Sequence, residues 1–203
     1  MKLYYSPGAC SLSPHIVLRE AGIPFELIKV DLATKRTESG QDFKAVNAKG
    51  YVPVIELDDG QRLTEGAAIV QYIADKAPTR GMAPASGTLD RYRLQEWLNF
   101  ISTELHKQFS PLFDPACEDS LRARLRERIE NRFAWTAQQL GTRDYLMGAN
   151  FTVADAYLYT ILLWARHLRF DLERWPALAA YFARVAARPK VRVALAAEGL
   201  VKS

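Results

Sequence analysis

The chain has 203 residues, of which 49% are hydrophobic, and only two are cysteines, Cys10 and Cys117. This composition supports a sizeable buried core and excludes intrinsic disorder as the main state. Two cysteines are too few for a disulfide-stapled scaffold or a cysteine-based zinc module, so we expect no metal and a reducing, cytoplasmic location. The start lacks a signal-peptide pattern, and no apolar run approaches the ~18 residues of a membrane span, so no membrane partner is expected.

The net charge of +4 lies entirely in the second part of the chain. Residues 1–80 carry ten Lys or Arg and ten Asp or Glu, whereas residues 81–203 carry seventeen and thirteen. Most of the excess is arginine, interrupted by Glu127 and Glu130. We interpret this run as a solvated helix face and expect no nucleic-acid partner. Its members are Arg122, Arg124, Arg126, Arg128 and Arg132.

The first elements alternate between strand and helix. Residues 2–5 form a short strand candidate, and apolar residues recur at helical spacing from 11 to 21. Gly22 and Pro24 are typical of a helix end. Residues 25–32 alternate in polarity and predict a second strand. A strand–helix–strand unit normally forms a right-handed parallel crossover, so these two strands should be parallel neighbours.

A hairpin and a helix follow in the same part of the chain. Residues 52–57 predict a third strand, Asp58–Gly60 a turn, and 61–64 the returning strand, because Asp-Gly between two such runs favours a hairpin. Residues 66–77 have helical spacing. The predicted architecture is a small mixed α/β sheet flanked by helices.

The remainder of the chain is predicted to be all-helical. Proline and glycine concentrate around residues 79–88, which we interpret as a linker between an α/β domain (1–78) and an all-α helical domain (89–203). Thr152 and Asp155 have the spacing of a capping box, which favours a structural role for Asp155 over a catalytic one. The predicted helices span residues 89–109, 121–140, 153–168, 176–188 and 191–197.

Cys10 is the first candidate for chemistry. It follows a Ser-Pro-Gly-Ala turn where the first strand ends and the first helix begins. Helix N-terminal amides lower the pKa of a nearby thiol and favour the thiolate. The alternative is a small buried hydrophobe. Cys117 stands among Asp114, Glu118 and Asp119, which raise the pKa of a thiol, so we expect it to be unreactive.

Two further positions could bind a peptide-like ligand. Pro53 opens a strand, which is tolerated at a strand start and permits a cis bond after Val52; the Val52 backbone could then pair with an extended ligand. Gly66 should present its amide at a helix N-terminus, a carboxylate site, beside Glu65, which could bind an ammonium. An ordinary strand start and an ordinary helix start remain the alternatives.

The long helix after the linker has a polar face. Asn99, Thr103 and His106 are spaced i, i+4 and i+7, away from an apolar stripe that includes Leu98 and Leu105. A polar helix face is usually only solvated. It would line a cleft if this helix packs beside the first domain.

Five motifs in this order resemble the cytosolic glutathione transferases, specifically the bacterial beta class. The resemblance covers essentially the whole chain. Each motif is moderately specific, and the five together at family spacing are highly specific. They are KLYYSPGACSL at 2–12, GYVP at 50–53, LTEG with AIVQY at 63–72, EWLNFIS through HK at 96–107, and FTVAD at 151–155.

The resemblance implies a thioredoxin-like N-terminal domain, an all-helical C-terminal domain, a homodimer, and glutathione as cosubstrate without a metal. It implies that Cys10 lies close enough to glutathione for a mixed disulfide and that Pro53 is a cis proline. Glu104 is implied to reach across the dimer interface. The residues implied to contact glutathione are Cys10, Lys35, Val52, Pro53, Glu65, Gly66, Asn99, Thr103, Glu104 and His106.

The implied activity is detoxification by conjugation of glutathione to hydrophobic electrophiles. Cys10 and His106 are the implied catalytic residues, which lower the pKa of the glutathione thiol so that its thiolate attacks an electrophilic carbon. Two positions depart from the usual pattern, because serine is common in the family where this chain has Gly66 and Thr103. The candidates for the second-substrate site are Phe109, Phe113, Tyr157 and Trp164, for which core packing is the alternative.

Two other functions remain open at this point. The first is reduction of glutathione mixed disulfides by a monothiol route through Cys10, since the chain has no CxxC pair. The second is a non-catalytic carrier of hydrophobic ligands, against which Cys10, Glu65 and His106 argue together. The sequence does not identify the physiological electrophile, because pocket residues rather than the fold decide it.

Overall fold

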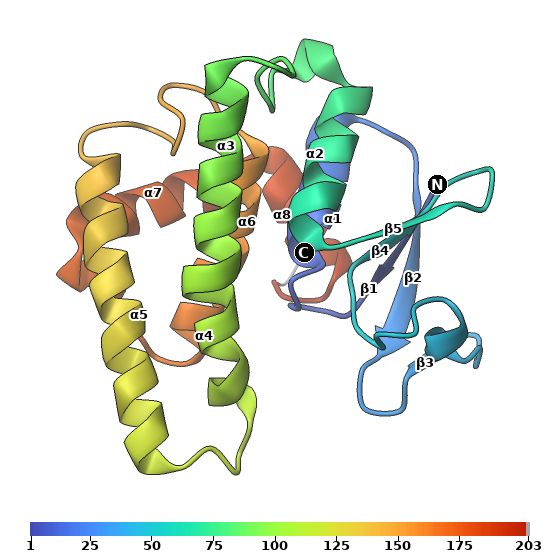
Figure 1. Cartoon of the computed structure of the whole chain (residues 1–203), viewed down its shortest axis with the longest axis horizontal. Coiled ribbons are helices and arrows are strands. Elements are labelled where there is room, and N and C mark those ends of the chain that lie inside the picture. Colours follow the sequence, from blue (N-terminus) through green and yellow to red (C-terminus); the bar gives the residue numbers. More distant parts are fainter. Residues whose placement is uncertain (202–203) are drawn as a thin grey trace. The chain divides into compact units, whose positions relative to one another are not determined.

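A computed structural model describes residues 1–201 of the chain. It consists of two compact units (Figure 1). The first comprises Met1–Arg80 together with the C-terminal segment that begins at Ala187, and the second comprises Gly81–Ala186. The predicted end of the helical domain, at residue 203, lies outside the described residues.

The first unit contains a five-stranded sheet in the order β3-β2-β1-β4-β5. The strands β1 and β2 are parallel, as predicted, whereas β4 is antiparallel to both β1 and β5. This mixed sheet is thioredoxin-like. The short strand β3, antiparallel to β2, was not predicted. The strands are β1 Lys2–Tyr5, β2 Glu26–Asp31, β3 Arg36–Thr37, β4 Val54–Glu56 and β5 Arg62–Thr64.

Two helices, α1 (Leu12–Ala21) and α2 (Gly66–Lys76), pack against each other in this unit. Ile16 and Ile69 are fully buried, since apolar residues repeat along one side of each helix. Gly22 ends α1 in the left-handed conformation, with φ at 70°, and its amide donates to the Leu18 carbonyl. This C-cap is the one that the sequence predicted.

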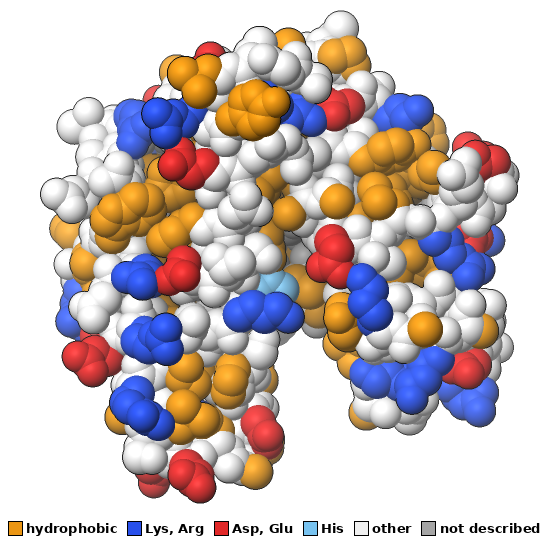
Figure 2. All heavy atoms as spheres, viewed as in Figure 1, with side chains coloured by type: hydrophobic (Ala, Val, Ile, Leu, Met, Phe, Trp, Pro, Cys, Tyr) orange, Lys and Arg blue, Asp and Glu red, His pale blue; other side chains and the backbone are white. Residues whose placement is uncertain are grey.

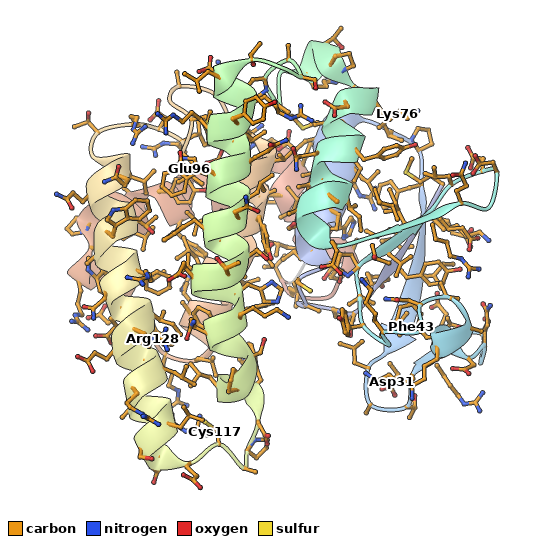
Figure 3. The ribbon with its side chains drawn as sticks, in the orientation of Figure 1. Asp31, Phe43, Lys76, Glu96, Cys117 and Arg128 are labelled. Atoms are coloured by element: carbon orange, nitrogen blue, oxygen red, sulfur yellow. The ribbon has the colours of Figure 1, made fainter. Side chains whose placement is uncertain are left out.

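A separate apolar cluster involves the short 3-10 turn η1 (Phe43–Ala45) and the sheet. Phe43 is fully buried, and its ring centroid lies 5.8 Å from that of Tyr4 on β1. Figure 3 labels Phe43 beside the sheet. The remaining buried members of the cluster are Val30, Val46, Val52 and Val54.

The C-terminal helix α8 (Pro189–Ala197) packs against α1 in the first unit, which differs from the predicted domain boundaries. Arg188 forms a bidentate ion pair with Glu20 of α1, with N–O distances of 2.8 and 3.0 Å. The helical spacing alone could not show which unit this last helix joins, because an apolar helix face fits either core.

The second unit is helical throughout its regular structure, and its centre is α6, which is buried along nearly all of its length. Phe109 and Phe133 are fully buried, with ring centroids 6.2 Å apart. The elements are α3 Leu89–Phe100, η3 Ile101–His106, α4 Lys107–Phe109, η4 Ser110–Phe113, α5 Asp119–Leu140, α6 Val153–His167, η5 Leu172–Arg174 and α7 Pro176–Ala186.

The predicted capping box at the start of α6 is confirmed. The Asp155 carboxylate accepts hydrogen bonds from the Thr152 amide at 2.7 Å and from the Tyr181 hydroxyl at 3.0 Å. Burial raises the pKa of this carboxyl, and its hydrogen bonds, led by the Leu146 amide, oppose the rise. Asp155 therefore has a structural role, which joins the start of α6 to α7.

One departure from prediction lies within the long helix of residues 89–109. The segment η3 is a π-helix, in which the amide of Lys107 donates to the carbonyl of Ser102, five residues earlier. A π-turn places successive side chains at different angles from those of an α-helix. The face predicted for Asn99, Thr103 and His106 assumed 3.6 residues per turn throughout, so it does not extend unchanged to His106.

Three arginines of α5, Arg122, Arg126 and Arg132, have partners within the second unit. Arg126 donates to the backbone carbonyls of Leu168 and Arg169, and Arg132 pairs with Glu104 at 2.8 Å. Figure 2 shows basic side chains mixed with acidic and uncharged ones over this part of the surface. These contacts agree with the interpretation of the run as an ordinary solvated helix face.

Candidate functional site

Cys10 lies in a short loop that connects β1 to α1. The loop turns after Ser6, whose carbonyl accepts from the Ala9 amide at 3.0 Å, and the Ser11 hydroxyl oxygen accepts from the Ser6 amide at 3.1 Å. The half-buried Cys10 thiol donates to the backbone carbonyl of Val52 at 3.2 Å. The fold therefore brings Cys10 and Val52, which are 42 residues apart, into direct contact.

The position of Cys10 relative to α1 refines the sequence prediction. Ser11 is the N-cap and the helix begins at Leu12, so Cys10 precedes the cap by one residue. A carbonyl oxygen accepts a hydrogen bond from a thiol and offers none to a thiolate. The contact with Val52 is thus one that the protonated sulfur makes.

The peptide bond between Val52 and Pro53 is cis, as the resemblance implied. Pro53 precedes β4, and its Cγ lies 3.9 Å from the position that a Cβ of Gly66 would take. Gly66 is the first residue of α2, where backbone amides have no partner within the helix. The Val52 backbone and the N-terminus of α2 are therefore neighbours in the first unit.

Glu65 is the N-cap of α2 and has a positive φ of 68°. Its carboxylate forms an ion pair with the ammonium of Lys49, which also donates to the Thr64 hydroxyl at 3.0 Å. The hydrogen bond to Glu65 raises the pKa of Lys49. The sequence prediction did not include Lys49, because 16 residues separate it from Glu65 and no local pattern joins them.

Lys35 lies near Gly50, the residue that follows Lys49. It has a positive φ of 57°, and its side-chain methylenes come within 3.8 Å of the position that a Cβ of Gly50 would take. A methylene of Lys44 reaches the same position at 3.8 Å. Gly50 itself has φ at 71°, which favours glycine. Lys35 and Lys44 therefore present two cations near the loop that leads to Val52.

The other candidate residues lie on α3 and η3 in the second unit. Asn99 and Thr103 are exposed, and the Thr103 hydroxyl donates to the Asn99 carbonyl at 3.0 Å. Glu104 is half-buried and pairs with Arg132 of the same chain. The structure thus brings Asn99 and Thr103 together, and it gives the Glu104 carboxylate a partner within its own helical unit.

His106 is half-buried and faces α6. Its Nδ1 lies 2.6 Å from the Tyr157 hydroxyl, and the Trp164 ring meets it edge-on with centroids 4.9 Å apart. Phe113 is 44% exposed and contacts Trp164 edge-on at 5.5 Å, whereas Phe109 is fully buried. Of the four aromatic residues predicted for a second substrate, only Phe113 is substantially exposed within this chain.

Cys117 lies in the loop before α5 (Figure 3), in the second unit. Its sulfur is 3.8 Å from the carbonyl of Glu118, and Arg122 donates to its backbone carbonyl. These contacts are those of a loop that is fastened to α5. They leave Cys10 as the cysteine with a place among the candidate residues.

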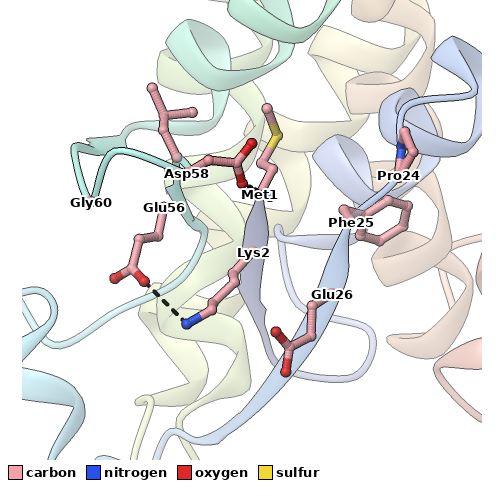
Figure 4. Close-up of a pocket in the computed structure, with 9 residues that line it drawn as sticks. Met1, Lys2, Pro24, Phe25, Glu26, Glu56, Asp58 and Gly60 are labelled. Carbon is pink, nitrogen blue, oxygen red and sulfur yellow. Dashed lines mark hydrogen bonds and ion pairs between the residues drawn. The ribbon is translucent and has the colours of Figure 1, made fainter.

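A hollow of about 570 Å³ opens at the start of β1, between the beginning of β2 and the end of β4 (Figure 4). Lys2 and Glu56 form an ion pair of 3.4 Å at its wall. Because Cys10 follows the other end of β1, this hollow is at the far end of the strand from the thiol. It contains none of the predicted site residues.

The described part of the chain, residues 1–201, has no group of three or more His, Cys, Asp or Glu placed to hold a metal ion. Within the same residues, no helix combines the length and the apolar character that crossing a bilayer requires.

Comparisons with known proteins agree with this arrangement. Residues 8–76 match the model of the glutathione S-transferase N-terminal domain, and residues 100–189 match that of the C-terminal domain. The chain is 48% identical over 200 residues to glutathione S-transferase GstA of Escherichia coli O157:H7, covering 98% of this chain and 100% of the relative. It is 40% identical to glutathione S-transferase GST-4.5 of Xanthomonas campestris, over 98% and 100% of the two chains.

Solved structures give the same result. BphK, described as a bacterial GST in a ternary complex, superposes with a TM-score of 0.97 at 56% identity, over 98% of this chain and 100% of that one. The beta-class glutathione S-transferase of Sphingomonas chungbukensis superposes with a TM-score of 0.96 at 47% identity, over 99% and 100%. The chain therefore belongs to the glutathione S-transferase family, in its bacterial beta class.

Proposed function

We propose that this glutathione transferase joins the sulfur of glutathione to hydrophobic electrophiles. The observation that carries the proposal is the grouping, within one unit, of the Cys10 sulfur, the Val52 backbone and the N-terminus of α2. These groups match the parts of a γ-glutamyl-cysteinyl peptide: a thiol, a peptide backbone and a zwitterionic end.

The residues present fit such a ligand. The Gly66 amide and the positive end of α2 suit the γ-glutamyl carboxylate. The Glu65 carboxylate suits the ammonium of the γ-glutamyl end, which competes with the Lys49 ammonium for this carboxylate. The Val52 backbone pairs with the cysteinyl part as an added strand does, and Lys35 binds the glycyl carboxylate.

The catalytic roles follow the chemistry of the thiol. Glutathione supplies a sulfur that is mostly protonated at neutral pH, and its thiolate is the nucleophile. His106 offers an N–H donor to this thiolate. Cys10 offers its S–H once that hydrogen leaves the Val52 carbonyl for the glutathione sulfur. When the sulfur attacks, an S–C bond forms, and the leaving group departs with its electron pair or, for an epoxide, the ring oxygen takes that pair.

Several finer features belong to the same proposal. The active protein is a homodimer, in which Asn99, Thr103 and Glu104 contribute to glutathione binding. An exposed aromatic patch on α3 and α5 supports an interface of this kind, because Trp135 is 41% exposed and lies 4.6 Å from the Phe100 ring centroid. We further propose a cytoplasmic location, where thiols remain reduced.

A second candidate activity is the reduction of glutathione mixed disulfides through Cys10. The observation in its favour is the half-buried, hydrogen-bonded thiol itself. In this reaction the Cys10 thiolate attacks the disulfide, forms a new S–S bond with glutathione and releases the other thiol. A second glutathione then attacks that bond, so that Cys10 is restored and both glutathiones leave as glutathione disulfide.

A kinetic panel with the wild type and Cys10→Ala tests both activities. Glutathione is supplied with an aryl halide, an epoxide or a mixed disulfide. We expect Cys10→Ala to retain conjugation at a reduced or similar rate and to lose disulfide reduction. Loss of both activities would contradict the separate roles. Calorimetry that detects no glutathione binding to the wild type would reject the proposed function altogether.

A further inference from the structure

Lys35 and Lys44 converge on the same place in the first unit, although they come from different segments. Methylene carbons of both side chains lie 3.8 Å from the position that a Cβ of Gly50 would take. Gly50 is buried, so the two chains approach each other over its backbone. Within the described residues 1–201, no acidic side chain pairs with either ammonium. Both charges can therefore be directed at an anion outside the protein.

The backbone fixes the positions of both lysines. Lys35 has a positive φ of 57°, and its amide donates to the Asp31 carbonyl at 2.9 Å. Its own carbonyl accepts from the Phe43 amide at 2.8 Å, which joins Lys35 to the residue before Lys44. Phe43 is fully buried and anchors this junction; Asp31 and Phe43 are labelled in Figure 3. A positive φ at a residue with a side chain is costly, and such positions concentrate where a ligand is held.

The direction of bound glutathione follows from the surroundings of Val52. Gly66, which is proposed to bind the γ-glutamyl carboxylate, lies beside Pro53, the residue after Val52. The first residue of the ligand is then on the Pro53 side, so the ligand runs antiparallel to this segment. Its glycyl residue extends past Tyr51 toward Gly50, because each residue of an extended chain advances by ~3.4 Å.

We propose that Lys44 is a specificity-determining residue, which joins Lys35 in binding the glycyl carboxylate of glutathione. The inference rests on the proposed function and adds a second cation to the one proposed there. A carboxylate has two oxygens, and each ammonium can donate to one of them. The pair of lysines selects peptides that end in a free carboxylate over those that end in a neutral group.

Calorimetry with glutathione and with its C-terminal glycyl amide tests this inference. The amide keeps the rest of the ligand and lacks only the charge. The wild type should bind glutathione more tightly than the amide. Lys44→Met should weaken glutathione binding about two- to fivefold, the range for an exposed charge pair, and leave the affinity for the amide unchanged. Added salt should reduce the difference between the wild type and Lys44→Met.

Two variants and a kinetic measurement complete the test. Lys44→Arg keeps the positive charge and should retain the preference for glutathione over the amide. Lys29→Met, at an exposed position on β2, should bind both ligands as the wild type does. Lys44→Met should raise KM for glutathione and leave kcat unchanged, because the glycyl carboxylate carries the same charge before and during the reaction.

The outcomes separate this inference from the proposed function. An equal loss of affinity for glutathione and its amide in Lys44→Met, or no loss for either, overturns the inference. A wild type that binds the two ligands equally well overturns it too, since the carboxylate charge is then not recognised. A wild type that binds neither ligand rejects the proposed function itself.

Discussion

The carboxylate of Glu198 accepts a hydrogen bond from the backbone amide of Gly8 at 2.9 Å, although 190 positions separate the two residues. The other carboxylate oxygen lies 2.7 Å from Nδ1 of His15, and both side chains are completely buried. Gly8 belongs to the loop that leads to Cys10, and His15 belongs to α1. The end of α8 thereby fastens the loop and the helix that flank the thiol.

Glu198→Ala should destabilise the protein by about 2–4 kcal/mol, because it removes the shared acceptor of the buried His15 ring and the partly buried Gly8 amide. Urea unfolding measures the loss. Glu198→Gln keeps an oxygen acceptor and should cost less. The control is Glu173→Ala at an exposed position on η5, which should change stability by less than about 0.5 kcal/mol. Equal stabilities for Glu198→Ala and this control would show that the contact contributes nothing.

Alkylation of Cys10 gives a second measurement on the same variants. If the Glu198 contact fixes the loop, iodoacetamide should modify the thiol at a different rate in folded Glu198→Ala than in the wild type. Cys10→Ala identifies the portion of the reaction that belongs to Cys117. An unchanged rate would mean that Gly8 and Cys10 are held independently of α8.

Lys49→Met should increase the affinity for glutathione by up to about fivefold, because the Lys49 ammonium and that of the ligand compete for the Glu65 carboxylate and an exposed ion pair is weak. Calorimetry at low ionic strength measures the change, and added salt should reduce it. Lys29→Met on β2 is the matched control. A lower affinity in Lys49→Met would indicate that Lys49 itself binds the ligand.

Gly66→Ser should strengthen glutathione binding about fivefold, because a hydroxyl at the helix N-terminus adds one hydrogen bond of ~1 kcal/mol to the ligand carboxylate. The site has room, since the new Cβ would meet Pro53 Cγ at 3.9 Å, an ordinary contact. Gly66→Ala adds the same Cβ without the hydroxyl, and it separates the hydrogen bond from any gain in helix stability. Equal affinities for the two variants would rule out the hydroxyl effect.

Much of the first unit could be predicted from local patterns. The Gly22 stop, the turn at Asp58–Gly60 and the start of α2 at Gly66 follow from the backbone preferences of single residues. The resemblance, rather than any local rule, gave the cis bond at Pro53. The short strand β3 was not predicted, because two residues are too few to show an alternation of polar and apolar side chains.

The unpredicted features depend on contacts between distant residues. The pairing of Lys49 with Glu65 and that of His15 with Glu198 leave no trace in local spacing. The π-turn at Ile101–His106 was not predicted, because the spacing of the apolar residues fits an uninterrupted α-helix. The sequence contains several aromatic residues on α6, and nothing in it indicates that Tyr157 is the one that contacts His106. This hydrogen bond could be identified only in the folded structure.

The buried Tyr159 makes stability sensitive to alkaline pH. Burial raises the pKa of its hydroxyl from 10.0 to about 12, against a smaller opposing effect of Arg166. Between pH 10 and pH 12 the unfolded chain loses this proton while the folded protein keeps it. The contribution of the protonated Tyr159 to the free energy of unfolding is therefore fully present below pH 10 and decreases as pH rises. At pH 11 it has fallen by about 1.4 kcal/mol, since one pKa unit corresponds to ~1.4 kcal/mol.

Tyr159→Phe removes this titration and keeps the ring that stacks on Phe182. The loss of unfolding free energy between pH 8 and pH 11, measured in urea by circular dichroism, should be smaller than in the wild type by about 1.4 kcal/mol. Tyr92→Phe, at a ring that is 58% exposed, is the control and should behave as the wild type does. If Tyr159→Phe loses as much stability as the wild type over this pH range, the Tyr159 hydroxyl has the same pKa in the folded and unfolded chains. Another group then causes the loss of stability at alkaline pH.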